Sequence, residues 1–147
     1  MENRNYQQQV YQIWDDLWAQ RRKAPYFIIY LKNFSFSRLI ANEFKKKIGE
    51  LNGKKVIEIG CGTGTTSLRF SKLGAKVSLL DISLNSIMLS KSIFKYKNMH
   101  AFHFNASMFE LPLKNKQFDI VWNAGVLEHF EKEDQKKALL EMKRICK

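Results

Sequence analysis

The first third of the chain carries a helical pattern of apolar positions. Across residues 5–23 apolar side chains recur every three or four positions, which predicts an amphipathic helix with one face turned inward. Pro25 ends or turns this helix, and a second helix is expected over 38–51 with Ser37 as its N-cap. Residues 1–50 are therefore predicted to form a helical lead or lid. The inward face of the first helix is expected to carry Val10, Ile13, Trp14, Leu17 and Trp18.

From residue 51 onward, short apolar runs alternate with segments of helical spacing. Strands and helices in alternation form βαβ units, which give a parallel sheet with right-handed crossovers. We therefore predict an α/β fold for residues 51–147. The predicted strands are 55–59, 76–80, 101–104 and 118–122, and the predicted helices are 65–73, 84–97 and 134–146. The last helix is expected to turn Ala138, Leu139, Met142 and Ile145 toward the sheet.

Composition narrows the class of protein. The 147 residues have the length of one domain, and 45% apolar with 27% charged residues is typical of a globular protein. Two cysteines cannot build a disulfide framework, and without a Cys-x-x-Cys pair no metal site is expected. No apolar run approaches the roughly 20 residues that span a bilayer. No signal-peptide pattern opens the chain, so a cytoplasmic protein without a membrane span is predicted.

The net charge of +11 raises the question of an anionic partner. The basic residues of the chain are mostly lysines, and the excess of basic over acidic residues is spread over the first two thirds of the chain. Lysine is a hydrated point charge rather than a planar group that reads bases. The charge therefore indicates either a solvated basic surface or an anionic partner such as RNA.

The most informative segment is residues 56–64, where an apolar strand runs into three glycines and then a helix. Such a loop lets the backbone approach a ligand closely, and the N–H groups of the following helix favour an anion. The third glycine comes one residue earlier than in the dinucleotide pattern, and Thr65 takes the place of its small residue. Glu58 at the strand end repels phosphate and attracts an ammonium group. A ligand with an amino-acid end fits both features.

The segment 58–64 resembles the first motif of class I S-adenosylmethionine-dependent methyltransferases. Asp81 ends the second strand, 21 positions after Gly60, where this family binds the ribose hydroxyls. Asn105 and Ala106 follow the third strand where the family reads the adenine, usually with Asp in place of Asn105. Residues 118–130 are similar to the fourth-strand motif of the small-molecule, methyltransferase type 11-like branch.

The resemblance implies S-adenosyl-L-methionine as cofactor and S-adenosyl-L-homocysteine as product. It also implies a Rossmann-like parallel sheet in the strand order 3-2-1-4, preceded by N-terminal helices, with residues 51–147 as a partial cofactor-binding domain. The cofactor-binding residues that it implies are Glu58, Gly60, Cys61, Gly62, Gly64, Asp81, Ile82, Asn105, Ala106 and Asn123.

Two further groups of residues bear on the acceptor. His129 follows the fourth strand and is the candidate general base, with capping or packing as the alternative. Asp119 begins that strand, so a structural role away from the ligand is predicted. The aromatic residues Trp14, Trp18 and Phe27 are expected to pack in the core or lid, with a substrate pocket as the alternative.

Three functions remain open at this point. The resemblance favours methyl transfer to a small-molecule acceptor by in-line displacement, and the charge leaves RNA as the alternative acceptor. The third possibility is a cofactor-binding remnant that serves a partner subunit, because the family's seven-stranded sheet has three strands beyond those predicted here. Either the chain is a C-terminally truncated fragment, or the edge of the fourth strand is covered by the N-terminal segment or by a second copy in a homodimer; truncation or dimerisation is expected.

Overall fold

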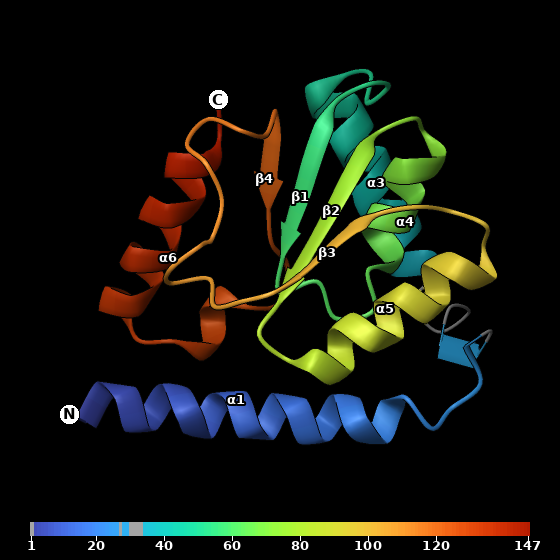
Figure 1. Ribbon diagram of the computed structural model, residues 1–147. Coiled ribbons are helices and arrows are strands. Elements are labelled where there is room, and N and C mark those ends of the chain that lie inside the picture. Colours follow the sequence, from blue (N-terminus) through green and yellow to red (C-terminus); the bar gives the residue numbers. More distant parts are fainter. Residues whose placement is uncertain (1, 27, 30–33) are drawn as a thin grey trace.

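The computed structural model describes residues 2–26, 28–29 and 34–147. Two helices precede an alternation of strands and helices (Figure 1). The helices are α1 (Glu2–Arg21), α3 (Phe34–Ile48), α4 (Thr65–Lys72), α5 (Leu84–Tyr96) and α6 (Lys132–Ile145), with the short 3-10 helix η1 (Leu127–His129). The strands are β1 (Lys55–Ile59), β2 (Lys76–Asp81), β3 (Phe102–Asn105) and β4 (Ile120–Trp122).

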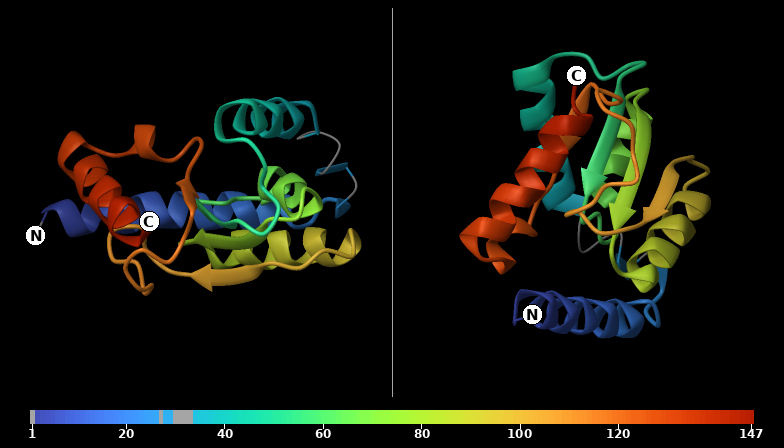
Figure 2. Two further views of the ribbon diagram at one scale, coloured as in Figure 1. Left: turned by 90° about the horizontal axis from the view of Figure 1, so that it is seen from above. Right: turned by 60° about the vertical axis from the view of Figure 1, so that its left-hand side comes forward.

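The four strands form one parallel sheet in the order β3-β2-β1-β4. Glu58 in β1 lies opposite Leu79 in β2 on one side and Trp122 in β4 on the other. The strand order and the N-terminal helices confirm the predicted α/β architecture. All four strands end at the same edge, and α1 lies across that carboxyl edge (Figures 1 and 2).

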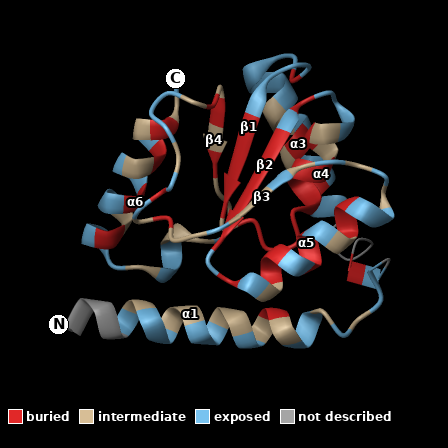
Figure 3. Cartoon of the chain, in the orientation of Figure 1, coloured by how far each residue is buried: buried red, intermediate tan, exposed pale blue. Residues whose placement is uncertain are grey.

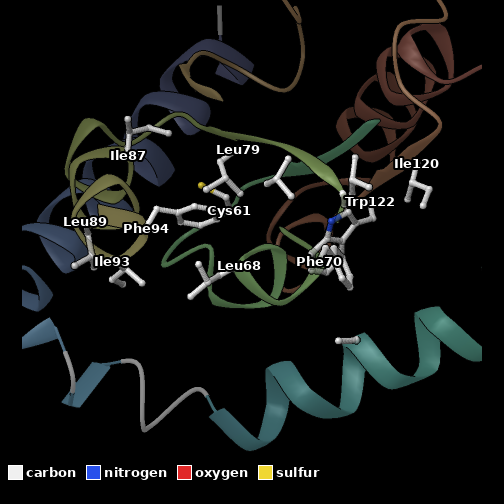
Figure 4. Packing of buried hydrophobic residues seen from close by; sticks show 14 of the residues in the cluster. Cys61, Leu68, Phe70, Leu79, Ile87, Leu89, Ile93, Phe94, Ile120 and Trp122 are labelled. Carbon is white, nitrogen blue, oxygen red and sulfur yellow. The ribbon is translucent and has the colours of Figure 1, made fainter. Parts of the chain in front are cut away.

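The core has two layers, one on each face of the sheet. Helices α3, α4 and α5 cover the face to which Val56 points, and α6 covers the face that receives Ile57 and Ile59. The interior of β1 and β2 is buried throughout, whereas α1 is exposed along much of its length (Figure 3). Phe70 and Trp122 meet in the layer under α3 (Figure 4).

Three local predictions were wrong. Ser37 does not cap α3, because the helix begins at Phe34; its buried hydroxyl accepts a hydrogen bond from Arg69 Nε at 3.2 Å. Leu139 is 50% exposed, while its neighbours on α6 at positions 138, 142 and 145 face the core. Ile13 on α1 is 66% exposed, because that helix turns its Trp14 and Trp18 side toward the protein.

The amino end of the sheet is organised by Asp119. Its carboxylate accepts hydrogen bonds from the backbone N–H of Lys55 at 2.8 Å and from Lys147 Nζ at 2.7 Å. This confirms a structural role for Asp119. The last residues of the chain pair in parallel with the segment before β4, through a bridge between Phe118 and Cys146.

Among the described residues, α1 packs mainly against α5 and α3 mainly against α4, and the Phe44 ring of α3 lies 5.2 Å from the ring of Trp122 in β4. The covering of the β4 edge by the N-terminal segment or by a second copy stays a prediction. Among the described residues no helix has both the length and the apolar character needed to cross a lipid bilayer.

Phe70 gives a direct test of this core. Its side chain is fully buried, and its ring centroid lies 5.0 Å from that of Phe44 and 5.4 Å from that of Trp122. We expect Phe70→Ala to lower the free energy of unfolding by about 3–5 kcal/mol, because it removes apolar contacts and leaves a cavity. Urea denaturation measures the change. Phe102, which is 70% exposed, is the matched control, and Phe102→Ala should cost less than about 0.5 kcal/mol. Equal losses in the two variants would contradict this packing.

Candidate functional site

A cavity of about 230 Å³ lies between the carboxyl edge of the sheet and α1. Its lining includes two groups of residues that differ in chemistry. We call the first group the glycine-loop side; it consists of Glu58, Gly60, Cys61, Gly62 and Asp81. We call the second group the aromatic side; it consists of Tyr11, Trp14, Phe109, His129 and Phe130.

The glycine loop owes its shape to backbone conformations that favour glycine. Gly60 and Gly62 have φ angles of +68° and +51°. A Cβ atom on Gly60 would overlap Val126, and one on Gly62 would lie 2.8 Å from the Trp18 ring. Gly62 therefore admits α1 to close contact, and Gly60 admits the loop after β4.

Glu58 is a buried carboxyl group on the cavity wall with a strongly perturbed pKa. The side chain is buried, and its Oε2 atom has no hydrogen-bond partner. Burial raises the pKa of Glu58 to about 8; hydrogen bonding by Ser67 opposes the rise, and the nearby charge of Asp81 adds to it. Glu58 is therefore protonated at neutral pH. Since the unfolded chain loses this proton near pH 4.5, Glu58 lowers the free energy of unfolding progressively as pH rises from 4.5 toward 8.

Asp81 joins the glycine loop to the start of α5. One carboxylate oxygen accepts hydrogen bonds from Gly62 N at 2.9 Å and Ser86 Oγ at 2.8 Å, and the other accepts from Ser83 N at 2.9 Å. Burial raises the pKa of Asp81, and these hydrogen bonds act in the opposite direction. A carboxylate offers about four acceptor positions, so one remains for a ligand donor.

Helix α1 is fastened over the cavity by polar contacts at both ends. Asp15 accepts hydrogen bonds from Ser83 Oγ at 2.6 Å and Asn85 Nδ2 at 2.9 Å, which lowers the pKa of Asp15. Arg22 donates to Asn85 Oδ1 at 2.6 Å. Near the other end, the Tyr6 hydroxyl donates to the carbonyl oxygen of His129 at 2.9 Å. The helix is thus held against both α5 and the loop after β4.

Most of the residues singled out in the sequence meet at this cavity. Of the expected cofactor-binding residues, Gly64, Asn105 and Asn123 do not line it. Asn105 instead donates hydrogen bonds to the backbone carbonyl groups of Asp81 and Ile82, and the Asn123 amide lies 3.6 Å from Met142 Sδ. The contact of these three with a cofactor stays a prediction. Those that do line it are Glu58, Gly60, Cys61, Gly62, Asp81, Ile82 and Ala106, together with His129.

Two aromatic residues considered for a substrate pocket, Trp14 and Trp18, also line the cavity, whereas Phe27 falls outside the described residues. Sequence reasoning missed Tyr11, Phe109 and Phe130. Tyr11 lies one turn before Trp14 and Asp15, so its spacing was a usable signal. Phe109 and Phe130 lie in irregular loops, where no periodicity points to them. In the described part of the chain no three His, Cys, Asp or Glu side chains gather as metal ligands.

Comparison with known proteins places this geometry in a family. Residues 56–147 match the family model described as a methyltransferase domain. The chain belongs to the methyltransferase-domain family. This confirms the resemblance to class I S-adenosylmethionine-dependent methyltransferases. The matched region begins in β1, so it contains the glycine loop and Asp81 but not α1.

Individual relatives of this methyltransferase domain differ in their acceptors. It is 31% identical over 116 residues to the malonyl-[acyl-carrier protein] O-methyltransferase of Buchnera aphidicola subsp. Baizongia pistaciae, covering 78% of this chain and 44% of the relative. It is 32% identical over 83 residues to the tRNA U34 carboxymethyltransferase of Pseudomonas aeruginosa, covering 54% of this chain and 26% of that one. The chain therefore spans less than half the length of these relatives.

The fold is also found in solved structures. The magnesium protoporphyrin IX methyltransferase of Synechocystis PCC 6803, crystallised with S-adenosylmethionine, superposes with a TM-score of 0.68. The two are 20% identical, and the match covers 76% of this chain and 53% of that one. The likeness shows that the two proteins share the Rossmann-like methyltransferase fold.

The attachment of α1 gives a prediction with a built-in control. Asp15→Ala removes the acceptor for Ser83 and Asn85, so we expect amide hydrogen exchange in α1 to accelerate about tenfold while the sheet stays protected. Exchange followed by mass spectrometry measures this. Asp16→Ala removes the same charge from the adjacent residue, whose carboxylate accepts a hydrogen bond from Gln12 within α1 and, among the described residues, none from α5. Equal acceleration in both variants would show that Asp15 does not fasten the helix.

Proposed function

We propose that this methyltransferase domain binds S-adenosylmethionine in the cavity and transfers its methyl group to a small-molecule acceptor. The observation that carries the proposal is the Glu58 carboxyl group, buried on the cavity wall with one oxygen lacking a partner. A buried polar atom without a partner carries a desolvation cost that a ligand donor relieves. An ammonium group meets that need, and the sulfonium cofactor carries one at its amino-acid end.

The neighbouring residues fit the rest of the cofactor. Asp81 keeps an acceptor position for a ribose hydroxyl after its three protein hydrogen bonds. Ile82 and Ala106 line the cavity beyond Asp81 and offer apolar surface for the adenine. In this assignment Glu58, the glycine loop and Asp81 bind the cofactor, and the aromatic side receives the acceptor.

In this proposal the protein aligns the cofactor with the acceptor and removes a proton from the acceptor. S-adenosylmethionine, when bound, supplies an electrophilic methyl group on a positively charged sulfur. The cavity walls would hold the cofactor and the acceptor in line. His129, at the aromatic side, would take the proton from an acceptor hydroxyl whose oxygen receives the methyl group. The cofactor would leave as the neutral thioether S-adenosylhomocysteine.

RNA is the second candidate acceptor, and it is supported by the likeness to a tRNA-modifying relative and by the lysines at the far end of the sheet. Lys55 begins β1 and lies in register with Lys76, which begins β2, and Lys54 precedes them. These lysines lie at the amino end, whereas the cavity opens at the carboxyl end. That separation favours the small molecule. A homodimer through the β4 edge, or service to a partner subunit, is compatible with either acceptor.

Proton release tests the cofactor assignment. Because binding an ammonium group ionises a Glu58 whose pKa is about 8, S-adenosylmethionine should release about one proton near pH 6.5 and bind more tightly as pH rises toward 8. Isothermal titration calorimetry in two buffers of different ionisation enthalpy measures the proton count. Glu58→Gln should abolish the release and weaken binding at least about tenfold. Glu128→Gln, an exposed glutamate outside the cavity lining, should change neither. Binding without proton release in the unaltered chain would reject the role of Glu58.

The RNA alternative has its own signature. If RNA is the acceptor, the chain should bind tRNA with an affinity that falls steeply as salt rises, because released counterions drive such binding. Filter binding between low and moderate salt measures the slope. We expect no such slope, and a steep one that Lys54→Gln and Lys55→Gln reduce would favour RNA over a small molecule.

A further inference from the structure

We infer that the acceptor of this methyltransferase is an uncharged aromatic molecule with a hydroxyl group. The inference rests on the proposed function, and it concerns the aromatic side of the cavity rather than the cofactor. It follows from three properties of the cavity wall: its ring surfaces, the absence of lysine and arginine among the described lining residues, and the histidine His129.

The ring surfaces come from elements far apart in the sequence. Phe109, after β3, and Phe130, after η1, form an edge-to-face pair with centroids 5.2 Å apart. Trp14 on α1 meets the His129 ring at 5.0 Å with an interplanar angle of 62°. Tyr11 adds a further ring from α1. Two rings that meet at a steep angle expose the face of one ring and the edge of the other. A flat aromatic ligand packs well against such a surface.

The lining of the cavity does not share the basic character of the chain. The chain holds 25 lysine and arginine residues, yet none of the described residues that line the cavity is a lysine or an arginine. The acidic lining residues, Glu58 and Asp81, belong to the glycine-loop side. An anionic acceptor on the aromatic side would be desolvated without a lysine or arginine as counterion, which is a costly arrangement. A neutral acceptor avoids this cost.

His129 supplies the third property. It lines the aromatic side, and its position is fixed twice, by the Tyr6 hydroxyl on its carbonyl oxygen and by the Trp14 ring against its imidazole. A base held at this place serves an acceptor that must lose a proton. A phenolic hydroxyl has such a proton, and its ring meets the aromatic wall.

A matched pair of probes separates charge from shape. 2,3-Dihydroxybenzamide and 2,3-dihydroxybenzoate have nearly the same shape, but only the second is an anion at pH 7. Each is titrated into the chain saturated with S-adenosylhomocysteine, and quenching of the fluorescence of Trp14 and Trp18 reports binding. We expect the amide to bind at least about tenfold more tightly, which corresponds to about 1.4 kcal/mol.

A positive charge added to the wall should reduce or remove this preference. Gln7 lines the cavity on α1, whereas the adjacent Gln8 is exposed and does not line it. Gln7→Lys supplies the missing cation, so it should raise the affinity for the benzoate about tenfold relative to the benzamide. Gln8→Lys adds the same charge to the chain and should leave the ratio unchanged.

The outcomes distinguish this inference from the proposed function. Equal binding of the two probes, an unchanged ratio in Gln7→Lys, or no quenching by either probe would overturn the uncharged aromatic acceptor. Calorimetry of S-adenosylhomocysteine on the same samples reports the cofactor site separately. Normal heats with failed probes reject the acceptor class alone, and absent heats with the amide preference intact reject the cofactor assignment alone.

Discussion

The hydrogen bonds of Asp81 are the constraint on which the site depends. Through Gly62 N and Ser86 Oγ its carboxylate fixes the glycine loop against α5, and through Ser83 N it fixes the turn after β2. The Ser83 hydroxyl in turn donates a hydrogen bond to Asp15 on α1. Connected hydrogen bonds thus link the glycine loop to α1, the helix that lies over the cavity. A change in any one member alters the placement of the others.

The distribution of charge explains how a basic chain builds a site without cations. In a parallel α/β fold the strand starts and the strand ends lie at opposite edges of the sheet. Lys55 and Lys76 lie in register at the starting edge, and both are exposed. Glu58 and Asp81 lie at the ending edge, where burial raises their pKa values. The fold therefore separates these lysines from the two buried carboxyl groups by the length of a strand.

The sequence predicts the sheet and the glycine-loop side of the cavity more closely than it predicts the orientation of α1. The short apolar run and the three glycines predict β1 and the loop after it, and the order of the predicted strands places Asp81, because local conformation and chain order decide these features. The face of α1 is decided by partners instead. Asp15 accepts a hydrogen bond from Ser83, and Arg22 donates one to Asn85. In the orientation of the helix that allows these contacts Ile13 is exposed, although the apolar pattern predicts that it faces inward. Such distant polar contacts leave no period in the sequence.

Asn105 shows the same limit at a single residue. Its position after the third strand matches a family motif, yet its amide donates to the backbone of Asp81 and Ile82. An asparagine side chain both donates and accepts, so here it stabilises the end of β2 in a way that aspartate cannot. The motif predicts the position of Asn105. That its amide group donates to the backbone of Asp81 and Ile82 is visible only in the structure.

The two sides of the cavity come from different parts of the chain, and this bears on how function is inferred. The methyltransferase family match begins at residue 56, so it contains Glu58, the glycine loop and Asp81. Tyr11 and Trp14, which complete the aromatic side, lie on α1 before the match. The glycine-loop side therefore lies within the part of the chain that matches the family, whereas Tyr11 and Trp14 lie on a helix outside it. Under the proposed function, in which the aromatic side receives the acceptor, the acceptor named for a relative consequently carries less weight than the chemistry of the wall that α1 completes.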